Sequence, residues 1–239
     1  MNAALAAAAT LVACAFALST LDRWLRRRRP HDLAWTVSLA LFALGAGALW
    51  WAESVGWGLG AFRVFYLAGA ILNVPWLALG TVYLLADRLP FRQHSGRQAG
   101  EQFGNRVRGW LILISGFAVG VVLFAPTRAA VTGDELPTGK DVFGVAPRVL
   151  AAVGSGLAAL IIVAGAVWSV WRPRRSGRRL LLGNVLIAVG TLILSASGTL
   201  AGRLGKDRAF AVTLLIGICV LFAGFLVATG TRSDQRATQ

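Results

Sequence analysis

Seven apolar segments run along the chain, and short stretches between them hold most of the charged residues. By residue number the segments cover 3–21, 33–51, 63–86, 109–125, 148–171, 180–200 and 209–230. A helix rises about 1.5 Å per residue and the bilayer core is about 30 Å thick, so segments of this length can cross a membrane. The pattern therefore predicts an all-α protein, a seven-transmembrane-helix bundle that forms a single transmembrane domain over residues 1–239.

Loops rich in arginine alternate with loops that hold fewer basic residues. The loops after the first, third and fifth segments, residues 22–32, 87–108 and 172–179, carry five arginines each. Because basic loops remain in the cytoplasm, the alternation predicts an N-out, C-in orientation, and we expect a multi-pass protein of the cell inner (plasma) membrane. The same loops attract anionic lipid headgroups. The net charge of +14 is thereby explained by topology, and no nucleic-acid partner is expected.

The third segment has an asparagine, a proline and a tryptophan at its middle. Six of its residues recur at steps of three and four and so share one helical stripe: Tyr66, Gly69, Asn73, Trp76, Gly80 and Tyr83. Such a stripe suits neighbouring helices better than lipid, because glycines let backbones approach and polar groups need partners. Pro75 removes a backbone donor and is expected to leave a carbonyl near residue 71 without its helical partner.

Two interpretations of this stripe remain open. Asn73 makes a structural hydrogen bond between helices and Pro75 only bends the helix, or Asn73 and Trp76 line a ligand site near the membrane midplane.

A second seam of small and polar residues lies in the last two segments. It consists of Asn184, Ala188, Thr191, Ser195 and Gly198, followed by Thr213, Gly217 and Gly224. The seam indicates close helix packing, or a polar cavity shared by the third, sixth and seventh segments. The candidate ligand-binding residues are Tyr66, Asn73, Trp76, Tyr83, Asn184, Thr191 and Ser195.

Two charged residues flank the link between the second and third segments. Glu53 and Arg63 could pair across this link or contact a polar ligand in an outward vestibule, whereas an Arg63 that extends to the lipid headgroups would only anchor the helix.

Ionisable side chains avoid the centre of every segment, which argues against proton pumping. The histidines, His31 and His94, fall in predicted cytoplasmic loops, and no metal-ligand or catalytic constellation is visible. We therefore expect no cofactor, no metal and no catalytic residue.

The layout resembles that of SWEET sugar facilitators, although their paired Pro-Gln signature is absent because Trp76 follows Pro75. This resemblance implies a 3+1+3 parallel repeat. In keeping with it, Trp24 and Trp171 each precede an arginine-rich loop, and Arg63-Val64-Phe65 is similar to Arg208-Ala209-Phe210. The layout also resembles seven-helix sensor regions of bacterial kinases.

The stretch FYLAGAILNVPWLALGTVYLL in the third segment resembles seven-helix integral membrane proteins of GC-rich bacteria, which implies no particular activity. The sequence favours a non-enzymatic ligand-sensing or accessory protein that acts through a protein partner or as a homo-oligomer. The alternative is a facilitative transporter of a small neutral solute through a cavity between the third, sixth and seventh helices.

Overall fold

A computed structural model describes residues 2–86, 96–133, 136–171, 182–183, 185–194, 196 and 207–229. The predicted all-α class is confirmed, because the described part of the chain forms no strand and contains only an isolated bridge between Thr127 and Phe143. The elements are α1 Asn2–Arg27, α2 Pro30–Val55, α3 Leu59–Val64, the π-helix η1 Phe65–Leu72, α4 Asn73–Ala86, α5 Gly96–Phe124, α6 Gly139–Val142, α7 Val145–Trp171 and α9 Asp207–Thr229.

Six helical stretches are long and apolar enough to cross a membrane. They are Ala3–Arg27, Pro30–Val55, Leu59–Leu84, Gln102–Phe124, Val145–Trp168 and Phe210–Val227. They correspond to six of the seven predicted segments. The remaining one, residues 180–200, is described only in part and contains the shorter apolar helix Val185–Leu194.

Several predicted loops are helical. The predicted first loop, 22–32, is wrong in its extent, because α1 continues to Arg27 and only Arg28 and Arg29 separate it from α2. Similarly, α5 begins at Gly96, well inside the loop predicted to reach residue 108. Hydropathy marks the thickness of the membrane core, whereas a helix rich in arginine, a good helix former, continues beyond it.

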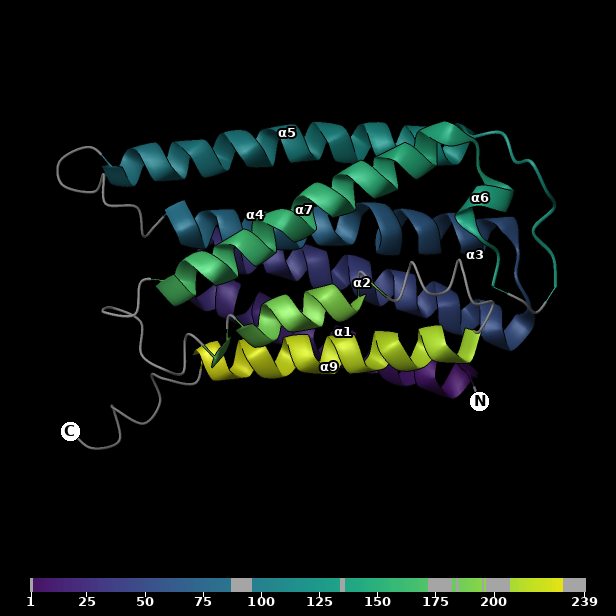
Figure 1. Ribbon diagram of the computed structural model, residues 1–239, viewed down its shortest axis with the longest axis horizontal. Helices are drawn as coiled ribbons and strands as arrows, with labels where there is room; N and C mark the ends of the chain where they lie inside the picture. Colours follow the sequence, from purple (N-terminus) through teal and green to yellow (C-terminus); the bar gives the residue numbers. More distant parts are fainter. Residues whose placement is uncertain are drawn as a thin grey trace.

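The third predicted segment occupies the centre of the bundle (Figure 1). Its three elements α3, η1 and α4 follow one another without a break from Leu59 to Ala86. Helix α4 packs against α2, α5 and α7, while α1 packs along α2 and against α9. Among its residues with described side chains from Phe65 onward, none is exposed, so this stretch contacts protein on nearly every side.

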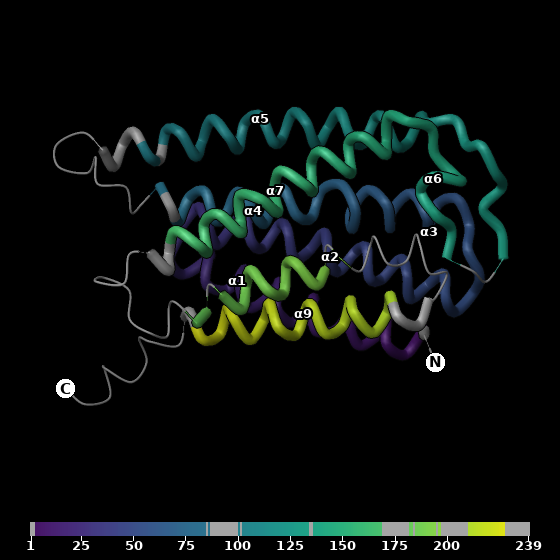
Figure 2. Tube along the Cα trace, viewed as in Figure 1, coloured from purple at the N-terminus to yellow at the C-terminus, as the bar shows by residue number. Residues whose placement is uncertain are grey.

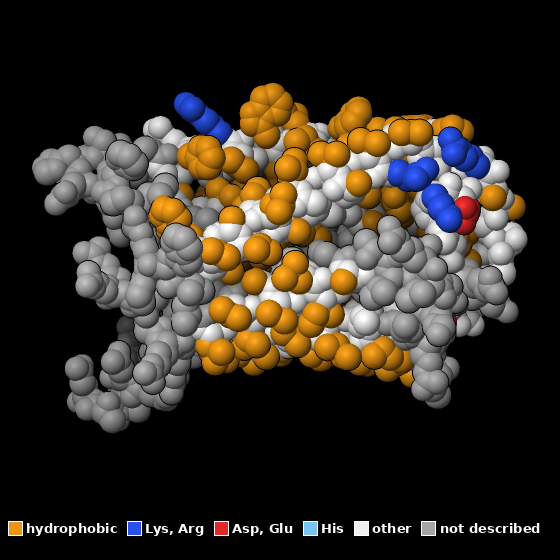
Figure 3. Space-filling model, viewed as in Figure 1, with side chains coloured by type: hydrophobic (Ala, Val, Ile, Leu, Met, Phe, Trp, Pro, Cys, Tyr) orange, Lys and Arg blue, Asp and Glu red, His pale blue; other side chains and the backbone are white. Residues whose placement is uncertain are grey.

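The outer surface of the bundle is apolar. Large side chains on α5 and α7, such as Trp110, Leu113, Phe117, Leu157 and Leu160, are exposed. Figure 3 shows hydrophobic side chains covering the visible lateral face, with Lys and Arg gathered towards the two ends. So large an exposed apolar surface is unfavourable in water, and it is compatible with a polytopic membrane protein.

Candidate functional site

A cavity of about 720 Å³ lies between α2, the stretch from α3 to the start of α4, α7 and α9. One end is bordered by residues 136–140, which lead into α6, and the other end reaches Asn73 and Val74. Leu194 is the residue of the sixth predicted segment that lines it. The cavity therefore involves the second and fifth predicted segments as well as the third and seventh.

Small residues leave the space that forms the cavity. Gly45 of α2 faces η1 so closely that a Cβ atom there would lie 3.2 Å from the Cα atom of Gly69. On the other side, a Cβ atom on Gly69 would meet nothing within 4 Å, and the same holds for Gly156 of α7. Both glycines line the cavity, so the absence of their side chains leaves the space open.

The walls of the cavity are mostly apolar and aromatic. The large side chains are Phe42, Phe62, Phe65, Leu136, Leu194, Phe210 and Leu214, and the polar and charged ones are Tyr66, Asn73, Thr138, Lys140, Arg148 and Ser155. This volume, with apolar walls and a few polar groups, is typical of small-molecule sites.

The π-helix explains how the bundle accommodates Pro75. The backbone N–H of Asn73 donates to the carbonyl of Ala68, five residues earlier. Continued by two residues, this register pairs residue 75 with the carbonyl of Ala70, and proline has no N–H to donate. The Ser155 hydroxyl of α7 donates to that carbonyl at 2.6 Å. The carbonyl that loses its helical partner is therefore that of Ala70, one residue before the predicted position, residue 71.

Asn73 makes the expected hydrogen bond between helices and also borders the cavity. The Ser38 hydroxyl of α2 contacts the Asn73 side-chain oxygen at 2.8 Å and the Asn73 backbone carbonyl at 2.9 Å. Asn73 is buried, and it also lines the inner end of the cavity. Its side-chain carbonyl thus joins α2 to α4 at the place where the cavity ends.

Trp76, Tyr83 and Thr191 lie outside the cavity lining. The Trp76 Nε1 donates to the Ser115 hydroxyl at 3.2 Å, and the Tyr83 hydroxyl donates to the Asn105 side-chain oxygen at 3.1 Å. Both contacts join α4 to α5. The Thr191 hydroxyl donates to the carbonyl of Ile187 within its own helix. Two further candidates, Asn184 and Ser195, lie outside the described residues.

The predicted vestibule pair does not line the cavity either. Arg63 donates through Nη2 to the carbonyl of Ala125 at 3.1 Å, just beyond the last turn of α5. A cation is favourable there because the carbonyl end of a helix carries partial negative charge. Within the described ranges, Glu53 and Arg63 form no ion pair with each other. The charged residues among the described part of the cavity lining are instead Lys140 and Arg148.

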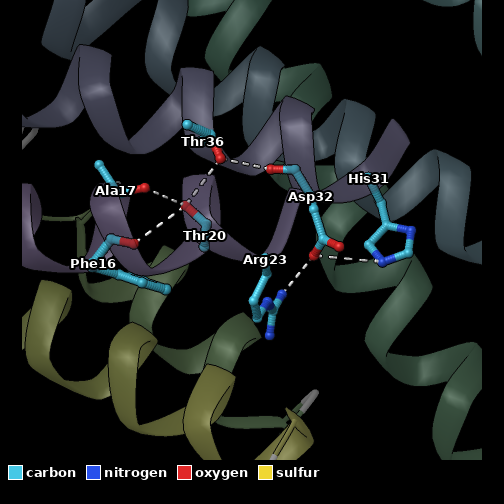
Figure 4. Close-up of polar contacts among 7 residues, drawn as sticks. All are labelled: Phe16, Ala17, Thr20, Arg23, His31, Asp32 and Thr36. Carbon is cyan, nitrogen blue, oxygen red and sulfur yellow. Dashed lines mark hydrogen bonds and ion pairs between the residues drawn. The ribbon is translucent and has the colours of Figure 1, made fainter. Parts of the chain in front are cut away.

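Sequence reasoning missed a buried ion pair at the opposite end of the bundle (Figure 4). The Arg23 Nη2 of α1 lies 2.6 Å from Asp32 Oδ1 of α2, and the Asp32 side chain is only 3% exposed. His31 Nε2 lies 3.7 Å from the same oxygen. Next to them the Thr36 hydroxyl donates to the Thr20 hydroxyl at 3.1 Å.

These residues belong to the predicted first loop, 22–32, but Arg23 lies in α1 and His31 and Asp32 lie in α2. A local signal was available in Pro30, at the first position of α2, followed by an acidic residue in the first turn. Proline at that position and an acidic first turn are both typical of helix starts. The Arg23 guanidinium also lies 4.1 Å from the centre of the Phe225 ring, so the pair joins α1, α2 and α9.

Compared with protein-family models and with curated proteins, the chain has no significant match.

Proposed function

We propose that the protein is a multi-pass protein of the inner (plasma) membrane that binds a small ligand in this cavity. In this proposal the N-terminus faces outward, the C-terminus faces the cytoplasm, and binding is sensed or passed on through a partner without any chemical step. The observation that carries the proposal is the cavity itself, which has about 720 Å³ of space, mostly apolar walls and a few polar groups.

The distribution of charge in the sequence supports the orientation, and the path of the helices supports a seventh crossing. The segment 136–140, which borders the cavity, belongs to the loop expected outside. Helix α7 ends at the left of the view and α9 begins at the right, with the helix Val185–Leu194 between them (Figure 2). A seventh crossing of the membrane requires such a path. We keep the 3+1+3 repeat in the proposal because it needs seven crossings.

The extent of the cavity fits a ligand that enters from one side. Its lining stops at Asn73 and Val74 on the central helix, and beyond them bulky side chains such as Leu79 and Tyr83 are buried against their neighbours. A facilitative transporter of a neutral solute would also need a second conformation in which this packed half opens. The site is therefore best suited to a ligand that enters and leaves on one side.

Filling the cavity tests the proposal. Leucine at Gly69 is expected to occupy the open space beside that residue, and to reduce the amount of co-purified small molecule or lipid about tenfold, equivalent to about 1.4 kcal/mol of binding free energy. Native mass spectrometry of the purified protein measures this bound fraction.

The matched control is Gly116→Leu on α5, because a Cβ atom added at Gly116 also meets nothing within 4 Å and this residue lies outside the cavity lining. Wild type and Gly116→Leu should retain equal amounts of bound molecule. Equal retention by Gly69→Leu would contradict the proposal. Flux of a neutral solute into liposomes containing the wild-type protein would instead support the transporter.

A further inference from the structure

We propose that the ligand is an anionic amphiphile, with a carboxylate or phosphate head beside Arg148 and Lys140 and an alkyl chain directed towards Asn73. This inference rests on the proposed function, because it assigns a chemical class to the ligand of the same cavity. It is carried by the charge at one end of the cavity and by the chemistry of the remaining wall.

The charge of the cavity is one-sided. Lys140 and Arg148 both line it, and none of the described residues that line it is acidic. Both side chains are exposed, and in the part of the chain that the structure describes neither forms an ion pair. The hydroxyl of Thr138 donates to Asp141, so the acidic neighbour of Lys140 already has a partner. Two accessible cations at one end of a cavity favour an anionic group there.

Two polar groups in the deeper part of the cavity, the Ser155 hydroxyl and the Asn73 side-chain oxygen, already have partners within the protein. The Ser155 hydroxyl donates to the carbonyl of Ala70, and the Asn73 side-chain oxygen accepts from Ser38. The neighbouring wall is formed by apolar side chains such as Phe42 and Leu214. A sugar or another ligand with many hydroxyl groups would leave several of them without partners, at a cost for each. An alkyl chain has no hydrogen-bonding groups, and burying its apolar surface is favourable.

The cavity also remains accessible beside α7. Ala152 and Gly156 line it and belong to a helix whose outer face is exposed at Val153 and Leu157. An amphiphile could therefore enter with its chain already among apolar residues and its head at the end that holds Lys140. The arrangement matches the orientation of a lipid in the outer leaflet, with its charged head outward.

The test compares ligands that differ only in the head. Isothermal titration of the protein in neutral maltoside micelles would use dodecanoate, dodecyl phosphate, dodecanol and dodecyltrimethylammonium, with empty micelles as the blank and inorganic phosphate as a head without a chain. We expect the two anionic amphiphiles to bind about tenfold more tightly than dodecanol, because a charged head forms stronger hydrogen bonds with Arg148 and Lys140 than a hydroxyl does. Inorganic phosphate alone should bind weakly, and the cationic amphiphile should bind least.

Substitutions of Arg148 test whether this residue causes the preference for an anionic head. Arg148→Gln should lose most of the preference for dodecanoate over dodecanol, whereas Arg148→Lys, which keeps the charge, should retain it. Arg128→Gln is the matched control, because Arg128 is an exposed arginine in the stretch before α6 that does not line the cavity.

Equal binding of dodecanoate and dodecanol, or an equal effect of Arg148→Gln and Arg128→Gln, would overturn the anionic assignment and leave the proposed cavity intact. Unchanged binding of every probe by Gly69→Leu would instead contradict the cavity as the binding site. Tight binding of inorganic phosphate alone would overturn the amphiphile and favour a soluble anion.

Discussion

Replacing Asp32 with alanine is expected to destabilise the protein by about 3–5 kcal/mol, the cost typical of removing one partner from a buried ion pair. Asp32 is 3% exposed and Arg23 is 18% exposed, so the substitution leaves a largely buried guanidinium without its carboxylate. The Arg23 Nε atom is already buried without a hydrogen-bond partner in the described structure, so the contact with Asp32 is important for keeping this guanidinium in the bundle. Unfolding of the purified protein by increasing SDS in mixed micelles measures the loss.

A second ion pair close by in the sequence is the matched control. Asp22 and Arg26 approach to 2.9 Å within α1, but their side chains are 57% and 75% exposed. Exposed pairs of this kind contribute about 0–1 kcal/mol, so Asp22→Ala should have a small effect. If Asp22→Ala and Asp32→Ala shifted the unfolding midpoint equally, the Arg23–Asp32 pair would not stabilise the packing of α1, α2 and α9.

The second large effect is expected at Gly190, where alanine should destabilise the protein by about 1–3 kcal/mol through overpacking. A Cβ atom there would lie 2.7 Å from the backbone nitrogen of Leu221 and 3.0 Å from the carbonyl of Gly217, both in α9. Backbone atoms cannot rotate away as a side chain does, so the two helices would have to separate. The same SDS unfolding measurement detects the change.

The control for this substitution is Gly116→Ala on α5, where an added Cβ atom meets nothing within 4 Å. Alanine is a better helix former than glycine by about 1 kcal/mol, so this variant should be neutral or slightly stabilised. An equally small effect at Gly190 would mean that the helix Val185–Leu194 does not pack closely on α9.

The helical class and the six long spans could be predicted because each span is read from a continuous apolar segment. The close packing of the last two segments was also predictable at Gly217 and Gly224. A Cβ atom on Gly217 would lie 2.7 Å from a Leu194 side-chain atom, and one on Gly224 would lie 2.7 Å from Leu186 Cβ. Small residues at helical spacing carry this information directly.

The partners of the central helix could not be predicted in the same way. One of the two interpretations placed the stripe of the third segment beside the sixth and seventh segments, but its side-chain hydrogen bonds are with Ser38 of α2 and with Ser115 and Asn105 of α5. A stripe of suitable residues identifies the face that packs, but any helix with a matching hydroxyl or amide can complete it. Which helix does so depends on the arrangement of the whole bundle.

The cavity was predictable only in part. Tyr66 and Asn73 were candidates and do line it, whereas Arg148 and Lys140 line it without having been candidates. Their importance comes from the loop before α7 packing against the end of η1. A Cβ atom on Gly139 would lie 2.5 Å from the Tyr66 ring, a contact between residues far apart in the sequence.

Accessibility from the outside tests most directly the claim that the cavity opens outward and ends near the membrane middle. In a background with Cys14 and Cys219 replaced by alanine, cysteine is introduced at Ala159, which lines the cavity, or at its neighbour Ala158, which is 3% exposed and packs in the core. A membrane-impermeant sulfonatoethyl methanethiosulfonate is then added to intact cells. We expect modification of Ala159→Cys from the outside and none of Ala158→Cys. Modification of Ala159→Cys only when the cytoplasmic face is exposed, in inverted vesicles, would contradict it.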